Sequence, residues 1–186
     1  FVLRAEDGIR DLEGLSLVVG LAVRKTLLSL GVATAGLKWP NDVLVDDRKI
    51  AGILLELVGD PADVCHVVLG IGINVNMLSA DVDQPWTSIL RETEQRVDRN
   101  VLVARLSDNL QYYLARHRSE GFGGLQSEWE EAHLWHGRAV SLIAGTNCVN
   151  GIVLGIDRQG ALRIEVDGVE KSFSGGELSL RLRNDS

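Results

Sequence analysis

Lys38 stands in a stretch whose neighbours restrict its backbone. Residues 36–56 read GLKWPNDVLVDDRKIAGILLE, so Lys38 is followed at once by Trp39 and Pro40. Pro40 fixes its own φ and biases the residue before it toward an extended conformation, which makes this corner stiff. A cation held in this way can stabilise negative charge that develops during a reaction. Lys38 is therefore either a cation held for a ligand or an ordinary solvated surface charge.

A second candidate site is the segment 66–77, HVVLGIGINVNM, which predicts a strand. Alternate residues of a strand share a face, and the odd positions here are all apolar, which indicates a core-facing side. The even positions include Gly70, Gly72 and Asn74, and Gly52 lies in a neighbouring predicted strand. Glycine in a strand often marks the close approach of a ligand or of another backbone. This face is either a ligand floor or the place of a bulge or tight helix–sheet packing.

Composition and the missing motifs exclude several classes of protein. The chain has 186 residues, 45% hydrophobic and 24% charged, which is typical of a soluble globular protein with a real core. The net charge of -7 argues against a broad nucleic-acid surface. Cys65 and Cys148 stand alone, which favours reduced cysteines over a disulfide and indicates the cytoplasm. There is no metal-binding histidine pattern, no Walker A or G-x-S-x-G motif, and no apolar run of about 18 residues.

The hydrophobic pattern predicts the elements that position these residues. A helix over 15–30 ends at Gly31, and a later helix carries the apolar stripe Leu102, Leu106, Leu110 and Leu114. In chain order we expect a helix over 15–30, strands over 37–45, 49–58 and 66–77, and helices over 98–121 and 125–135.

The sequence pattern of the chain changes at about residue 137. From there it predicts short strands with frequent turns, among them a two-residue hairpin at Asp167-Gly168 and a turn at Gly175-Gly176. The sequence therefore predicts an α+β protein with two domains. Residues 1–136 form a sheet packed with helices, and residues 137–186 form a small all-β unit of SH3-like size.

Three blocks, in this order and spacing, resemble the biotin protein ligase family, the biotin–[acetyl-CoA-carboxylase] ligases. They are KWPND at 38–42, KIAGILLE at 49–56 and GIGIN at 70–74. The segments GIDRQGAL at 155–162 and GGELSLR at 175–181 are similar to the family's C-terminal β domain. The resemblance covers essentially the whole chain. It implies a mixed β-sheet packed with helices, as in class II synthetases, followed by an SH3-like β-barrel.

The resemblance also implies an activity, the ATP-dependent ligation of biotin to a carrier-protein lysine. Biotin and MgATP would first give biotinyl-5′-AMP and pyrophosphate, and the biotinyl group would then pass to a biotin carboxyl carrier protein. Biotin, ATP and Mg²⁺ are the implied small molecules, and a homodimer is a further option. The resemblance implies no membrane contact, and it implies DNA contact only through a region absent from this chain.

The resemblance assigns roles to seven residues and leaves the metal set empty. Lys38 would be catalytic and would contact the biotin carboxylate and the adenylate phosphate. Trp86 could instead anchor a loop, and Arg181 could be a plain surface charge. Lys49 lies either near the phosphates or only on the exposed turn, and it is not included in the catalytic set. The implied biotin-binding residues are Lys38, Gly70, Gly72 and Ile73, and the implied nucleotide-binding residues are Asn74, Trp86 and Arg181.

The family's GRGRxGR loop, which folds over biotinyl-AMP, would lie upstream of Phe1. The resemblance therefore implies an N-terminally truncated catalytic core, and we expect residues 1–186 alone to be inactive or nearly so. Two alternatives stay open at this point, a lipoate ligase-like acyl transferase and the effector domain of a biotin-responsive transcriptional repressor. The Trp-Pro-Asn-Asp block and the C-terminal β unit favour biotin over lipoate.

Overall fold

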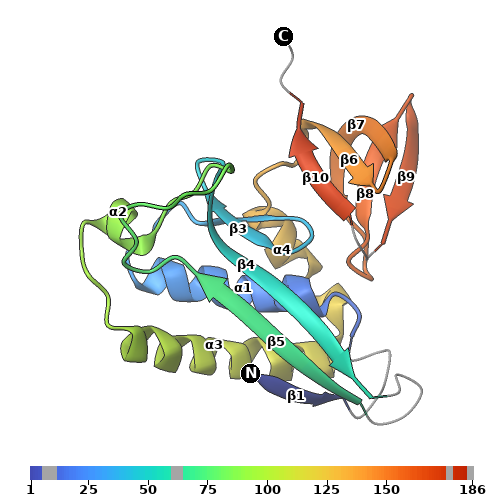
Figure 1. The fold of residues 1–186 in the computed structure, drawn as a ribbon. Helices are drawn as coiled ribbons and strands as arrows, with labels where there is room; N and C mark the ends of the chain where they lie inside the picture. Colours follow the sequence, from blue (N-terminus) through green and yellow to red (C-terminus); the bar gives the residue numbers. More distant parts are fainter. Residues whose placement is uncertain (6–11, 60–64, 175–177, 184–186) are drawn as a thin grey trace.

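The computed structural model describes residues 1–5, 12–59, 65–174 and 178–183 and shows an α+β fold with two antiparallel sheets (Figure 1). The α+β class predicted from the sequence is thereby confirmed. The first sheet has the strand order β1-β5-β4-β3-β2. Its strands are β1 (Val2–Ala5), β2 (Gly36–Lys38), β3 (Asp42–Val45), β4 (Arg48–Val58) and β5 (Cys65–Ile73).

Helices α1 and α3 lie side by side along the first sheet (Figure 1). Helix α1 is buried over most of its surface, and at Gly20 it packs against Leu37 and Ile53 of the sheet. The predicted stripe of α3 is buried at Leu102, Leu106 and Leu110. Among the described residues, no helix is both long and apolar enough to cross a membrane. The helical elements are α1 (Leu15–Ser29), α2 (Ile89–Thr93), α3 (Arg99–Glu120), η2 (Phe122–Gly124) and α4 (Gln126–Ala132).

The alternation predicted for β5 is confirmed by the burial of its odd residues. Gly52 lies opposite Gly72, and Leu54 lies opposite Gly70. Odd residues in the middle of the two strands, such as Ile53 and Leu69 at 3% exposure, face the helices. Even residues there face away from them, so on this side Gly52, Gly70 and Gly72 lie beside the exposed Leu54.

Three predicted element boundaries were wrong. The single strand expected over 37–45 is two antiparallel strands, because Pro40 has no N–H to donate and the chain reverses there. The strand expected over 66–77 ends at Ile73. The next residue, Asn74, donates its N–H to the Ile50 carbonyl at 2.9 Å. The helix expected over 125–135 ends at Ala132, because His133 has extended dihedral angles.

The second sheet contains the later strands in the order β10-β6-β7-β8-β9. Asp167 and Gly168 have φ angles of 52° and 76° and form the predicted hairpin turn. The predicted turn at Gly175-Gly176 lies outside the described residues, and closure into an SH3-like barrel stays a prediction. The strands are β6 (Ala139–Ala144), β7 (Asn147–Ile156), β8 (Leu162–Val166), β9 (Val169–Phe173) and β10 (Leu178–Leu182).

Side chains of the first part of the chain hold the second sheet in place. The Trp39 indole N–H donates to the Gly160 carbonyl at 3.1 Å. Helix α4 contributes Glu130, which accepts from the Ile156 N–H at 3.1 Å, and Gln126, which donates to the Ile156 carbonyl at 2.7 Å. The corner next to Lys38 is therefore tied to the turn between β7 and β8.

We predict that Trp39→Phe lowers the free energy of unfolding by about 1–3 kcal/mol, because it leaves the Gly160 carbonyl without its partner in a buried contact. Urea denaturation measures the change. The matched control is Trp86→Phe, the same change at a partly exposed ring. Equal losses at the two positions would show that the hydrogen bond to Gly160 contributes nothing.

Candidate functional site

Four residues from four neighbouring strands form one row across the first sheet. Lys38 pairs with Asp42, Asp42 with Gly52, and Gly52 with Gly72. Leu37 packs on α1, so the next residue of its strand, Lys38, faces the opposite side. The row therefore places a cation and a carboxylate at one end of a surface whose other end has no side chains.

Asp42 holds two lysines at this end of the row. Its Oδ2 lies 2.9 Å from Lys38 Nζ, and its Oδ1 lies 2.6 Å from Lys49 Nζ. The side chains of Lys38, Asp42 and Lys49 are 15%, 13% and 30% exposed. Burial raises the pKa of Asp42, but the charges and hydrogen bonds of the two lysines outweigh burial and lower the pKa below its ordinary value. Two cations facing one carboxylate leave a positive site that suits an anionic ligand.

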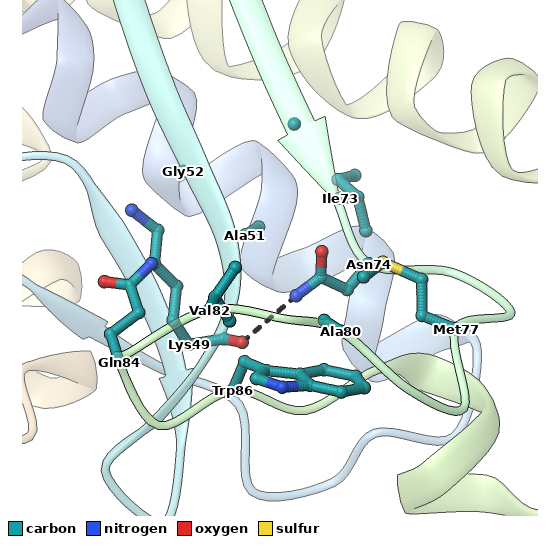
Figure 2. Close-up of a pocket in the computed structure, with 11 residues that line it drawn as sticks. Lys49, Ala51, Gly52, Ile73, Asn74, Met77, Ala80, Val82, Gln84 and Trp86 are labelled. Atoms are coloured by element: carbon teal, nitrogen blue, oxygen red, sulfur yellow. Dashed lines mark hydrogen bonds between the residues drawn. The ribbon is translucent and has the colours of Figure 1, made fainter.

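Two adjoining hollows lie along the glycine floor, which we define as Gly52, Gly70 and Gly72. The first has a volume of about 420 Å³ and extends to Trp86 (Figure 2). The second has a volume of about 510 Å³ and extends over Gly70. Both include Lys49, Gly52 and Gly72 in their lining, so Lys49 stands where they meet. The volumes are in the range of small-molecule sites.

The wall of the first hollow is a loop held against β4. Lys49 N–H donates to the Pro85 carbonyl and Thr87 N–H donates to the Lys49 carbonyl, both at 2.9 Å. Asn74 Nδ2 donates to the Thr87 carbonyl at 2.9 Å and to the Lys49 carbonyl at 3.3 Å. These bonds fix the backbone on both sides of Trp86, whose indole lies along the hollow between Gln84 and Met77 (Figure 2).

The structure brings most of the predicted site residues together. Gly72, Ile73, Asn74 and Trp86 line the first hollow and Gly70 lines the second, while Lys38 lines neither hollow and contacts the row through Asp42. Both amide hydrogens of Asn74 are directed at backbone carbonyls, so this residue has a structural use besides its predicted nucleotide contact.

Arg181 lies on the second sheet, unlike the other predicted residues. It lies on β10 opposite Ser141 and is exposed. Within the part of the chain that the structure describes, Arg181 does not line either hollow. Its contact with a nucleotide stays a prediction.

The sequence left open whether Lys49 lies near the phosphates or only on the exposed turn. The charged turn before it suggested exposure, but the side chain folds back over the floor, and a Cβ at Gly52 would lie only 2.9 Å from Lys49 Cε. Gly52 thus provides the space that Lys49 occupies. The available signal was the spacing of the hairpin, because pairing β3 with β4 brings Asp42 within reach of a lysine at the start of β4.

The residues around the row do not form a Mg²⁺ site. Both carboxylate oxygens of Asp42 already contact lysines, at 2.9 and 2.6 Å. Among the described residues, no cluster of three or more His, Cys, Asp or Glu side chains could hold a metal. Mg²⁺ in nucleotide sites is commonly bound through substrate phosphates, and no step below is assigned to it.

We predict that Asp42→Asn lowers the free energy of unfolding at neutral pH by about 1–3 kcal/mol, because two lysines lose their charged partner. The folded-state pKa of Asp42 is lowered, so its contribution is full above the ordinary value of 3.8 and is lost as the pH falls through the folded-state pKa. Urea denaturation at several pH values measures this.

Asp46→Asn is the matched control, because the Asp46 side chain is 74% exposed and its contact with Arg48 spans 3.5 Å. It should change stability little at any pH. A difference between wild type and Asp42→Asn that grows as the pH falls would contradict the assigned ion pairs.

Two family models match the chain. The model of the Biotin/lipoate A/B protein ligase family matches residues 1–74, and that of the Biotin protein ligase C terminal domain matches residues 136–181. The chain is 42% identical over 181 residues to the bifunctional ligase/repressor BirA of Escherichia coli (strain K12), covering 96% of this chain and 56% of BirA. The chain thus spans little more than half the length of this relative.

Two further matches cover a larger share of the protein to which the chain is compared. The chain is 34% identical over 168 residues to the biotin–[acetyl-CoA-carboxylase] ligase of Paracoccus denitrificans, covering 87% of this chain and 70% of that ligase. It superposes with a TM-score of 0.85 on a biotin protein ligase from Aquifex aeolicus in complex with biotin and ATP, at 28% identity, covering 98% of this chain and 78% of the other. The chain belongs to the biotin protein ligase family.

Proposed function

We propose that the complete protein activates biotin with ATP and transfers it to a lysine of a biotin carboxyl carrier protein. The observation that carries this proposal is the row Lys38–Asp42–Gly52–Gly72, which puts cations beside a floor without side chains. The relative solved with biotin and ATP supports the choice of substrates. MgATP is the form in which we expect the nucleotide to act.

In the first step, a carboxylate oxygen of biotin attacks the α-phosphorus of ATP, and the bond to the pyrophosphate oxygen breaks. Both reactants are anions, so a nearby cation reduces their repulsion and stabilises the charge that builds on the α-phosphoryl oxygens. Lys38 supplies this cation, and Lys49 supplies a second one at the junction of the two hollows. No proton needs to move in this step.

In the second step, the neutral amine of a carrier lysine attacks the acyl carbon of biotinyl-5′-AMP. The bond to the adenylate oxygen breaks, AMP leaves, and the amine loses a proton as the amide forms. The glycine floor allows the biotin ring system to lie against the strand backbone, with Ile73 beside it. Lys38 can stay near the phosphate and stabilise the leaving AMP.

The nucleotide side of the site is proposed to involve Asn74, Trp86 and Arg181. The Trp86 ring is partly exposed and lines a hollow, which suits stacking on adenine. Asn74 would act mainly by holding the backbone next to this ring. Arg181 would have to reach the phosphates from β10 of the second sheet.

We further propose that the two sheets mark two domains, a catalytic domain over residues 1–136 and a C-terminal domain over residues 137–186. The match of the C-terminal family model from residue 136 supports this division. The cytoplasm is the proposed location, because ATP and the carrier protein are used there.

We predict that Lys38→Ala lowers the rate of biotin-dependent pyrophosphate release by about 100-fold or more, because charge on the α-phosphate loses its stabilising cation. The measurement uses the complete protein with saturating ATP. Lys25→Ala is the matched control, since Lys25 lies over the Tyr112 ring and is not part of the row. Wild-type pyrophosphate release from Lys38→Ala would refute the role of Lys38.

We also predict that biotin is adenylated in strong preference to lipoate when both acids are supplied together. The matched C-terminal family model is that of biotin protein ligases, whereas the other matched model includes lipoate ligases as well. Mass spectrometry of a carrier protein exposed to both acids measures the ratio of the two products. Equal use of lipoate would leave the lipoate ligase-like alternative as the better assignment.

A further inference from the structure

We propose that Trp135 is a positioning residue for Lys38 and that it links this lysine to the chain segment leading into the second sheet. Lys38 Nζ lies 5.1 Å from the centroid of the Trp135 ring. The ring is 6% exposed and the lysine side chain is 15% exposed, so water screens this contact only weakly. A cation at this distance from an indole face is attracted by the negative charge of the ring.

The Trp135 ring is itself fixed by the β3–β4 hairpin. Its indole N–H donates to Asp47 Oδ1 at 2.8 Å. Asp47 lies in the turn between these strands with a φ of 59°. The hairpin that carries Asp42 and Lys49 therefore also orients the ring beneath Lys38.

The backbone before Trp135 runs alongside β2. Leu134 N–H donates to the Leu37 carbonyl at 3.0 Å, and His133 forms a parallel bridge with Leu37. A Cβ at Gly36 would lie 2.4 Å from the Leu134 side chain, so Gly36 permits this contact. The segment connects α4 to β6, and it is thereby anchored to the strand that ends at Lys38.

An aromatic face is well suited to hold a cation that must also act on a ligand. Asp42 accepts a hydrogen bond from the ammonium group of Lys38 and partly neutralises it. The ring of Trp135 attracts the same ammonium without adding negative charge and without a carbonyl or carboxylate acceptor. Lys38 therefore keeps its orientation while its remaining N–H groups and its charge stay available to an anion.

The catalytic consequence rests on the proposed function, but the contact itself can be measured without any activity. In the complete protein labelled with ¹³C-lysine, the Lys38 ε-methylene protons should be shifted upfield by the Trp135 ring current, with the signal assigned by its loss in Lys38→Ala. Trp135→Leu should remove the shift and Trp135→Phe should retain part of it. Lys25, 4.2 Å from the Tyr112 centroid, is the internal control and should not change. An unmoved Lys38 signal in Trp135→Leu overturns the proposal.

The rate of biotin-dependent pyrophosphate release then tests the role of the contact. Trp135→Leu should lower the rate roughly tenfold, whereas Trp135→Phe should retain most of it. Asp47→Ala, which removes the acceptor of the indole N–H but keeps the ring, should lower the rate less than Trp135→Leu does. In a Lys38→Ala background, Trp135→Leu should cause no further loss.

Other outcomes decide against the proposal. An equal loss from Trp135→Leu in the presence and absence of Lys38 would mean that Trp135 acts only by supporting the fold. If Trp135→Leu does not fold, a ring-fluorinated tryptophan at position 135 keeps the shape and weakens the ring charge, and an unchanged rate then refutes the contact. Absence of pyrophosphate release from wild type refutes the proposed function and leaves the lysine shift to decide on Trp135.

Discussion

The site depends on one carboxylate that two lysines share. Asp42 lies at the start of β3, with Lys38 on one side and Lys49 on the other, and its side chain is only 13% exposed. Removing this carboxylate from water would be unfavourable without the cations, and bringing the two cations together would be unfavourable without the carboxylate. Each of the three groups therefore requires the other two. Because two lysines share one carboxylate, a net positive charge remains next to the glycine floor.

The bare floor is possible because the opposite face of the sheet is well packed. Glycines at 52, 70 and 72 give up side-chain contacts and weaken the strands. The neighbouring odd residues, among them Ile53 and Leu69, are 3% exposed against the helices and supply the burial that holds β4 and β5 together. One strand pair thus separates two tasks by alternation, stability on one face and ligand access on the other.

The sequence predicted features that belong to a single helix, strand or hairpin. It did not predict contacts that form between separate elements. Alternation in β5, the stripe of α3 and the Asp167-Gly168 hairpin each follow from local pattern, and all three were predicted. The reversal at Pro40 and the end of β5 before Asn74 were missed because they depend on which strand the backbone pairs with next. The contacts of Lys49 and Trp135 were missed for the same reason, since register and a connection from a distant segment create them.

Two aromatic residues next to Lys38, Trp39 and Trp135, connect its corner to the second sheet in different ways. Trp39 follows it in sequence and donates to Gly160 in the turn between β7 and β8, whereas Trp135 touches it through space and precedes β6 in the chain. Two attachments at separate points restrict both translation and rotation of the corner, which a single attachment could not do. The second sheet is therefore attached to the corner that carries the lysine although, within the described residues, none of its strands lines the glycine floor.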